Sequence, residues 1–249
     1  MAGHNKWSKV KHIKAVVDAK RGKVFSKFSK ELTVAAKLGG SNPELNARLR
    51  SAIQNARAQN MPNDNIDRAI KKGAGELAGA TLEEIVYEGY GPGGVAILIE
   101  VVTDNRNRTV AELRTLMSKN GGSLAEAGSV AYLFTRRGEI RIDKGTLNED
   151  AATELALDAG ADDVADDGAE WIFYTATDQL FAVGSALQFR GIAPKSQHFI
   201  YQPMTTVTVA DLDTAKALIK LHDIVDDYDD TQNVHANFDL PDDIIAAIS

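Results

Sequence analysis

The residues with the clearest chemical potential are the lysines and arginines near the N-terminus. Residues 1–76 contain 16 Lys and Arg against 6 Asp and Glu, a net charge of +10, and residues 77–249 contain 12 against 29, a net charge of −17. Clustered cations bind phosphates through charge and the release of counterions, independently of base sequence. The sequence therefore predicts that the basic segment contacts nucleic acid, although the whole chain of 249 residues has a net charge of −7.

Two parts of this segment supply the candidate contacts. The first twenty residues carry lysines in every helical direction, which predicts an arm that orders on a partner, and Trp7 in this arm could stack on an exposed base. The next lysines, from Lys23 to Lys37, lie on one side of a predicted helix. They either bind phosphates or simply form the solvated face of an amphipathic helix. The candidate nucleic-acid-binding residues are Lys6, Trp7, Lys9, Lys11, Lys14, Lys20, Arg21, Lys23, Lys27, Lys30, Lys37, Arg50, Arg57, Arg106 and Arg108.

Other chemistries find little support in the sequence. The stretch GYGPGG at residues 89–94 fits a phosphate-binding glycine pattern, but a strand-like run follows it in place of a helix, so it predicts a tight hairpin turn. The absence of cysteine excludes disulfides, thiolate metal sites and a cysteine nucleophile. The aspartates near the C-terminus lack the glycine that a calcium loop requires and are interpreted as solvated helix ends and turns; they are Asp226, Asp227, Asp229 and Asp230.

We therefore expect no catalytic residue, no metal site, no cofactor and no small-molecule substrate. The five histidines show no metal-ligand spacing. Carboxylates are abundant, so an enzyme that uses a pair of them is a less favoured alternative, because no particular pair stands out.

The basic segment has the periodicity of short helices. Apolar residues recur at three- and four-residue steps between Lys23 and Leu38, and Gly39 and Gly40 end this helix. Asn42 is the expected N-cap of a second helix, and a third runs from about Asn63 to Lys72. Three or four such helices predict a small bundle.

Strands alternate with helices after residue 77. Residues 84–88 and 95–102 flank the glycine-rich turn and predict a hairpin. Thr109 and Glu112 have the spacing of a capping box, which predicts a helix start at Thr109, and residues 130–134 predict another strand.

The order βαββαβ follows over residues 139–202, which is typical of a ferredoxin-like fold. The predicted fold class is a multidomain α and α+β protein, with an N-terminal helical bundle followed by two α+β domains. The predicted domains are the basic bundle with its arm, 1–76, an acidic α+β domain, 77–135 plus 204–249, and a ferredoxin-like domain, 136–203, inserted in the acidic one.

Four long stretches of the sequence resemble the YebC family. They are MAGHNKWSKVKHIKAVVDAKRGKVFSKFSKELTVAAKLGG, NMPNDNIDRAIKKGAGE, EGYGPGGVAILIEVVTDNRNRT and QNVHANFDLP, and the match runs nearly end to end. The resemblance implies three domains, with the ferredoxin-like one inserted in the other α+β domain. It also implies a non-enzymatic role, described as DNA-binding transcriptional regulation. The nucleic-acid surface implied is the arm with Lys20, Arg21, Gly22 and Lys23.

Other members of that family are described as acting on translation at the ribosome, and mitochondrial members as translational activators of a cytochrome oxidase subunit. The chain departs from the family at Asn5 and Ile13, where Ser and Arg are expected, so the arm lacks one charge. His235 stands where an aromatic residue is common.

The sequence thus predicts a cytoplasmic, non-enzymatic DNA-binding transcriptional regulator, with an RNA-binding, ribosome-associated translation factor as the alternative. The acidic domains are expected to meet a basic protein partner, and their charge also raises the hypothesis that they compete with nucleic acid for the basic bundle.

No membrane contact is expected, because the longest apolar strand-like run, Val95–Ile99, is far too short for a span. The N-terminus lacks the apolar core of a secretion signal.

Overall fold

The computed structural model describes residues 20–248, which form two units. Unit 1 contains residues 20–30, 80–135 and 201–248, and unit 2 contains residues 31–79 and 136–200. Among these described residues, no helix combines the length and the apolar character that a membrane span requires. The coarse prediction of a mixed α and β fold is confirmed, and the three-domain division stays a prediction.

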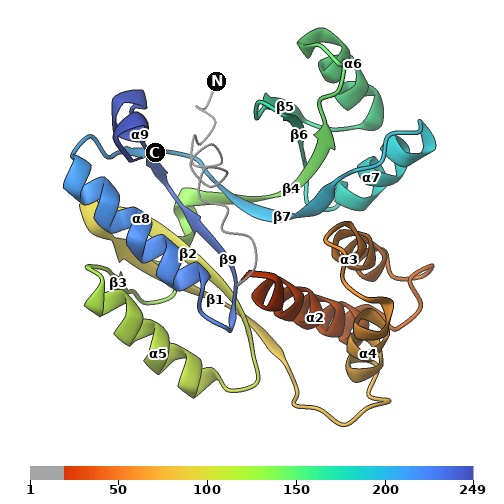
Figure 1. Cartoon of the computed structure of the whole chain (residues 1–249), viewed down its shortest axis with the longest axis horizontal. Coiled ribbons are helices and arrows are strands. Elements are labelled where there is room, and N and C mark those ends of the chain that lie inside the picture. The colour runs from red at the N-terminus through yellow and green to blue at the C-terminus, as the bar shows by residue number, and fades with distance from the viewer. Residues whose placement is uncertain (1–19, 249) are drawn as a thin grey trace. The chain divides into compact units, whose positions relative to one another are not determined.

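An antiparallel sheet with the order β3-β1-β2-β9 forms the centre of unit 1. Its strands are β1 (Glu83–Gly91), β2 (Val95–Thr103), β3 (Ser123–Leu124) and β9 (Thr231–Ala236). Helices α5 (Arg106–Lys119) and α8 (Leu212–Asp226) pack against one face of this sheet and against each other (Figure 1). The central strand β2 is buried on both faces, because Ile97 and Ile99 contact these helices while Ala96 and Leu98 pack in a second apolar cluster.

The predicted hairpin is confirmed. Strands β1 and β2 pair from Glu83 opposite Thr103 to Gly91 opposite Val95. The short 3-10 helix η1 (Pro92–Gly94) joins them, with Gly93 and Gly94 at φ values of 77° and 73°, which glycine adopts without strain. The remaining elements of unit 1 are the first half of α2 (Lys20–Gly39), η2 (Ala131–Leu133), α9 (Asp242–Ile248), and the parallel pair β8 (Val207–Thr208) and β10 (Phe238–Asp239).

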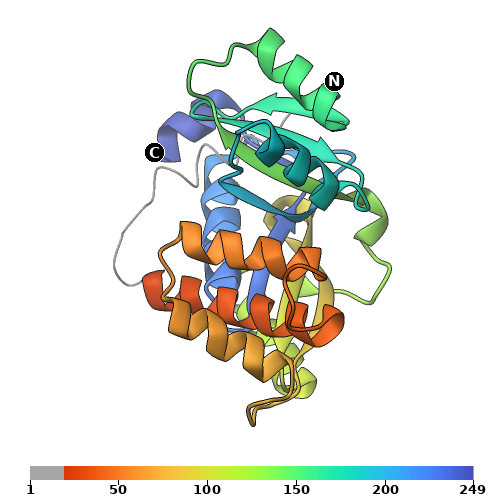
Figure 2. The same ribbon diagram turned by 90° about the vertical axis from the view of Figure 1, so that its right-hand side faces the viewer.

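Unit 2 contains the predicted βαββαβ order. Its elements are β4 (Phe134–Asp143), α6 (Glu149–Ala159), β5 (Asp163–Asp166), β6 (Glu170–Thr175), α7 (Leu180–Phe189) and β7 (Ser196–Pro203). The sheet order β5-β6-β4-β7 is that of a ferredoxin-like fold. Helices α6 and α7 cover one face (Figure 2), where Ile140, Ile142, Trp171 and Phe173 form the core.

Helices α3 (Ala47–Ala58) and α4 (Asn63–Gly73) also belong to unit 2, with the second half of α2. Polar side chains of α3 bind strand β7: Asn55 Nδ2 donates to Gln197 O at 2.9 Å, and Asn55 Oδ1 accepts from Gln197 N at 3.2 Å. Ser51 Oγ donates to the same carbonyl at 3.2 Å. These bonds fix α3 to the ferredoxin-like sheet.

Two predicted helix starts are wrong. Helix α3 begins after Asn46, whose Oδ1 accepts from Leu49 N at 3.0 Å, whereas Asn42 accepts from Glu44 N in a turn before the helix. Helix α5 begins at Arg106, because Asn105, four residues ahead of Thr109, caps it. In both cases several capping residues lie close together, and tertiary contacts select among them.

The predicted strand at residues 130–134 is also wrong. Residues 131–133 form η2, and strand β4 begins only at Phe134. The reason is Glu88, whose carboxylate accepts backbone N–H groups from Gly128, Val130 and Ala131 at 2.6, 2.7 and 2.8 Å. Donors that converge on one carboxylate curve the backbone and cannot join a ladder.

We expect two glycine substitutions to change stability in opposite directions. An added Cβ at Gly73 would lie 2.2 Å from Thr33 O, so Gly73→Ala should lower the free energy of unfolding by about 2 kcal/mol. An added Cβ at Gly22 would meet no atom of the described residues within 4 Å other than its chain neighbours and its own helix backbone, so Gly22→Ala should raise the free energy of unfolding by up to about 1 kcal/mol through helix propensity. Urea unfolding followed by circular dichroism measures both, and a shift of both midpoints in one direction would contradict the packing argument.

Candidate nucleic-acid interface

The predicted contact residues lie in separate parts of the protein. Lys6, Trp7, Lys9, Lys11 and Lys14 lie outside the described residues, and Lys20 and Arg21 begin helix α2. Lys23, Lys27 and Lys30 follow in α2, and Arg106 and Arg108 begin α5, all in unit 1. Lys37, Arg50 and Arg57 belong to unit 2. The structure therefore brings together the α2 lysines and Arg108.

The lysine face, which comprises Lys23, Lys27 and Lys30, contacts the acidic segment, which comprises residues 226–230 at the end of α8 and in the loop to β9. Each lysine pairs with a different aspartate. The Nζ to Oδ1 distances are 3.5 Å for Lys23 and Asp227, 3.0 Å for Lys27 and Asp226, and 2.8 Å for Lys30 and Asp230. The lysines that the sequence presented as a phosphate-binding surface are therefore paired within unit 1.

Backbone carbonyls complete this contact. Lys23 donates to Asp227 O at 3.1 Å, Lys30 to Asp229 O at 2.7 Å, and Lys27 to Gln232 O at 3.2 Å. The end of a helix presents unpaired carbonyls and a partial negative charge, which attracts cations. Helix α8 has no basic residue in its last turn, so α2 supplies the cations.

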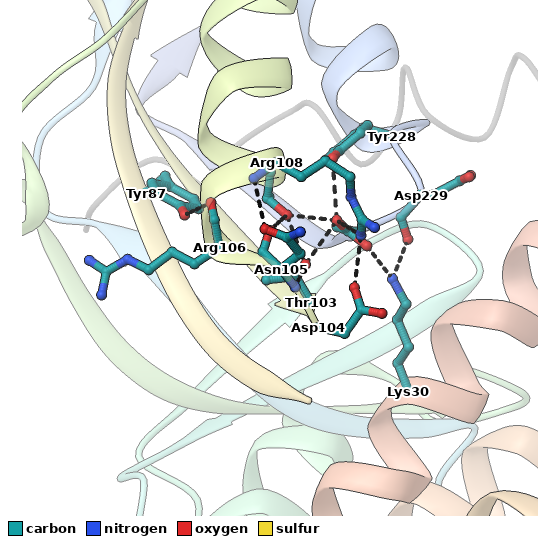
Figure 3. A network of polar contacts seen from close by, with 11 residues as sticks. Lys30, Tyr87, Thr103, Asp104, Asn105, Arg106, Arg108, Tyr228 and Asp229 are labelled. Atoms are coloured by element: carbon teal, nitrogen blue, oxygen red, sulfur yellow. Dashed lines mark hydrogen bonds and ion pairs between the residues drawn. The ribbon is translucent and has the colours of Figure 1, made fainter. Parts of the chain in front are cut away.

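Asp230 is the most buried member of the acidic segment, with 6% of its surface exposed. Its Oδ2 accepts from Thr109 Oγ1 at 2.7 Å, Thr103 Oγ1 at 3.1 Å, Arg108 Nη2 at 3.2 Å and Tyr228 Oη at 3.2 Å. Figure 3 shows Thr103 at the end of β2, Arg108 in α5, Lys30 in α2 and Tyr228 in the loop after α8 around this carboxylate. The predicted solvated turn is thus wrong for Asp230, because threonine and basic side chains enclose it.

Electrostatics favour an ionised Asp230. Burial alone raises the pKa of this carboxyl, but hydrogen bonds from Lys30, Thr109 and Arg108, together with the charge of Lys30, outweigh burial and hold the pKa well below its usual range. The pKa of Arg108 is raised, first because of its hydrogen bond to Asp230. The cluster therefore stays charged at neutral pH.

The two arginines at the start of α5 differ in whether their guanidinium groups can reach an external ligand. Arg108 is engaged with Asp104 at 3.0 Å as well as with Asp230. The guanidinium of Arg106 points away from this cluster (Figure 3) and Arg106 is exposed. Of the pair, Arg106 has the geometry for an external phosphate.

Unit 2 carries further cations on α3 and α4. Arg50 donates to Pro43 O at 3.1 Å and Arg57 to Asn63 Oδ1 at 3.3 Å, so both bind neutral oxygens. The sequence interpretation missed three exposed cations of α4, which are Arg68, Lys71 and Lys72. Within residues 20–248 none of these three makes an ion pair. Their spacing, at positions 68, 71 and 72, places them on one side of a helix and could have identified them from the sequence.

The fold and this site define a class: a mixed α and β protein whose basic N-terminal helix pairs with an acidic segment near the C-terminus. Two family profiles match the chain. "TACO1/YebC protein N-terminal domain" matches residues 5–76, and "TACO1/YebC second and third domain" matches residues 82–238. The chain belongs to the TACO1/YebC family.

Relatives of similar length support this assignment. A "Probable transcriptional regulatory protein" of Akkermansia muciniphila is 53% identical over 98% of both chains, and one of Syntrophobacter fumaroxidans is 49% identical over 100% of both. The crystal structure of a conserved hypothetical protein from Aquifex aeolicus matches with a TM-score of 0.85 and 46% identity, over 90% of this chain and 93% of that one.

We expect Asp230→Asn to lower the free energy of unfolding at pH 7 by about 3 kcal/mol, because Lys30 and Arg108 lose their shared anion. The pKa of Asp230 is depressed in the folded state, so its contribution is present above the unfolded pKa of about 4 and fades as pH falls. The difference between wild type and variant should therefore be smaller at pH 3 than at pH 7, as measured by urea unfolding.

Asp229→Asn is the matched control. Asp229 is exposed and contributes its backbone carbonyl to the contact, so we expect a change within about 0.5 kcal/mol at both pH values. Equal effects of the two substitutions would show that Asp230 has no special role.

Proposed function

We propose that this protein is a non-enzymatic, nucleic-acid-binding regulator of gene expression, and in the first instance a DNA-binding transcriptional regulator. The observation that carries the proposal is the concentration of a net charge of +10 in residues 1–76 of a chain whose remainder has −17. The printed names of the relatives, probable transcriptional regulatory proteins, support the regulatory role.

The polar side chains of α3 favour recognition of phosphates over recognition of base edges. Reading bases needs free amide or guanidinium groups on an exposed helix. On α3, Asn55 binds Gln197 through both amide atoms, and Gln54 Oε1 accepts from Gln188 Nε2 at 3.2 Å. The amide of Asn55 and the side-chain oxygen of Gln54 are thus committed within unit 2.

This argument also favours the alternative function, an RNA-binding, ribosome-associated translation factor. Folded RNA is recognised mainly by shape, phosphates and stacking on unpaired bases. A lysine-rich arm that contains Trp7 provides charge and one aromatic ring for such contacts. In both versions the protein acts in the cytoplasm, and the acidic remainder meets a basic protein partner.

Crosslinking in cells followed by sequencing of the bound nucleic acid separates the two versions. Recovery of discrete genomic sites supports the transcriptional regulator. Recovery of ribosomal RNA, together with sedimentation of the protein with ribosomes in a sucrose gradient, supports the translation factor and contradicts promoter binding.

We expect the triple substitution Lys6→Ala, Lys9→Ala and Lys11→Ala to weaken binding and to flatten its salt dependence. Each lost phosphate contact should reduce the slope of log K against log salt by about 0.9 for duplex DNA or about 0.7 for a single strand. The matched control removes three exposed lysines from the acidic part of the chain, Lys119, Lys216 and Lys220. If the two triple variants bind alike in fluorescence anisotropy, the arm does not carry the contacts.

A further inference from the structure

The contact between the lysine face and the acidic segment has the chemistry of phosphate binding. Lys23, Lys27 and Lys30 occupy successive turns of α2, about 4.5 to 6 Å apart along the helix axis. Each meets one carboxylate and one carbonyl oxygen at 2.7 to 3.5 Å. A row of anionic oxygens on a row of ammonium groups is the arrangement that a nucleic-acid backbone would also offer.

The contact weakens steadily along the helix. The side chains of the Lys30 and Asp230 pair are 18% and 8% exposed, those of Lys27 and Asp226 are 26% and 30% exposed, and those of Lys23 and Asp227 are 47% and 58% exposed. Exposed ion pairs contribute little and are screened by salt, whereas a buried carboxylate that loses its cation is strongly destabilised. The outer two pairs can therefore open while the inner one stays closed.

We propose that the acidic segment is an internal competitor for nucleic acid: it occupies the lysine face in the free protein, and the phosphate backbone of a bound nucleic acid displaces it from Lys23 and Lys27 but not from Lys30. This inference rests on the proposed function and adds a regulatory contact to it. It assigns the competition to Asp226 and Asp227, while Asp230 is a structural anchor.

Two opposing electrostatic effects determine the outcome of this competition. The acidic segment holds four aspartates within five residues, next to the carbonyl end of α8, so these groups repel one another unless cations lie on them. When a phosphate binds one of these lysines, the nucleic acid releases condensed counterions. The aspartate that loses the lysine must bind a cation from solution in return. Occupation by the acidic segment therefore lowers both the affinity and the salt dependence of binding.

The test is the double variant Asp226→Asn and Asp227→Asn, which removes the outer carboxylates and leaves Asp230 in place. Removing negative charge from the end of α8 should not harm the fold. The matched control is Glu154→Gln with Asp178→Asn, which changes net charge equally at exposed positions that make no ion pair within the described part of the chain. The probes are a fluorescein-labelled 20-nucleotide single-stranded RNA and a 20-base-pair DNA duplex.

At low salt we expect the double variant to bind the preferred probe about tenfold more tightly than the control does, since the exposed pair of Lys23 and the partly buried pair of Lys27 no longer compete. Its slope of log K against log salt should be steeper by up to about 1.4 on RNA or about 1.8 on DNA, because the same two phosphate contacts then release counterions without the uptake of cations by two freed aspartates. Chemical acetylation of the free protein provides a readout without nucleic acid. Labelling of Lys23 and Lys27, relative to exposed Lys119, should rise several-fold in the double variant, while labelling of Lys30 should not.

Each contrary result has a distinct meaning. Unchanged labelling of Lys27 in the double variant would show that the acidic segment does not cover it and would overturn the inference. Increased labelling with affinity and salt slope equal to those of the control would also overturn it, while nucleic-acid binding itself would stand. Failure of every variant and of the wild type to bind either probe would overturn the proposed function, and the inference with it.

Discussion

The charge of Asp230 is the constraint on which the arrangement of unit 1 depends. An ionised carboxylate with so little exposure persists only if hydrogen-bond donors or cations surround it. Lys30 comes from α2, Arg108 and Thr109 come from α5, and Thr103 ends β2. A single buried anion therefore fixes the first half of α2 against the sheet and sets where α5 begins.

A second buried carboxylate solves the same problem in a different way. Among the described residues, Glu88 has no cationic hydrogen-bond donor and relies on the backbone N–H groups of Gly128, Val130 and Ala131. Burial raises the pKa of Glu88, but these donors outweigh it and lower the pKa overall. The two buried carboxylates thus differ in their donors. Asp230 holds helix α2 through side-chain donors, whereas Glu88 shapes the loop before β4 through backbone donors.

This difference matters for function, because a lysine side chain can turn from an internal carboxylate to an external phosphate through rotation about its own bonds, without a change in the backbone. The lysine face lies directly after the arm in sequence. Within unit 1, three lysines of the basic part pair with three aspartates of the acidic part. The net charge of −7 is therefore compatible with a nucleic-acid partner.

The sequence alone determined the features that depend on neighbours along the chain. The hairpin at residues 83–103, the βαββαβ order and the amphipathic α2 follow from glycine placement and apolar periodicity, which act over a few residues. Only the tertiary structure decided which groups pair at long range. Lys27 and Asp226 are 199 residues apart, and a charge pair across such a separation leaves no local pattern, because either residue alone is typical of a solvated surface. The choice of Asn46 over Asn42 as a cap has the same origin, since the side chain of Asn46 also reaches Ala35 O in the preceding helix.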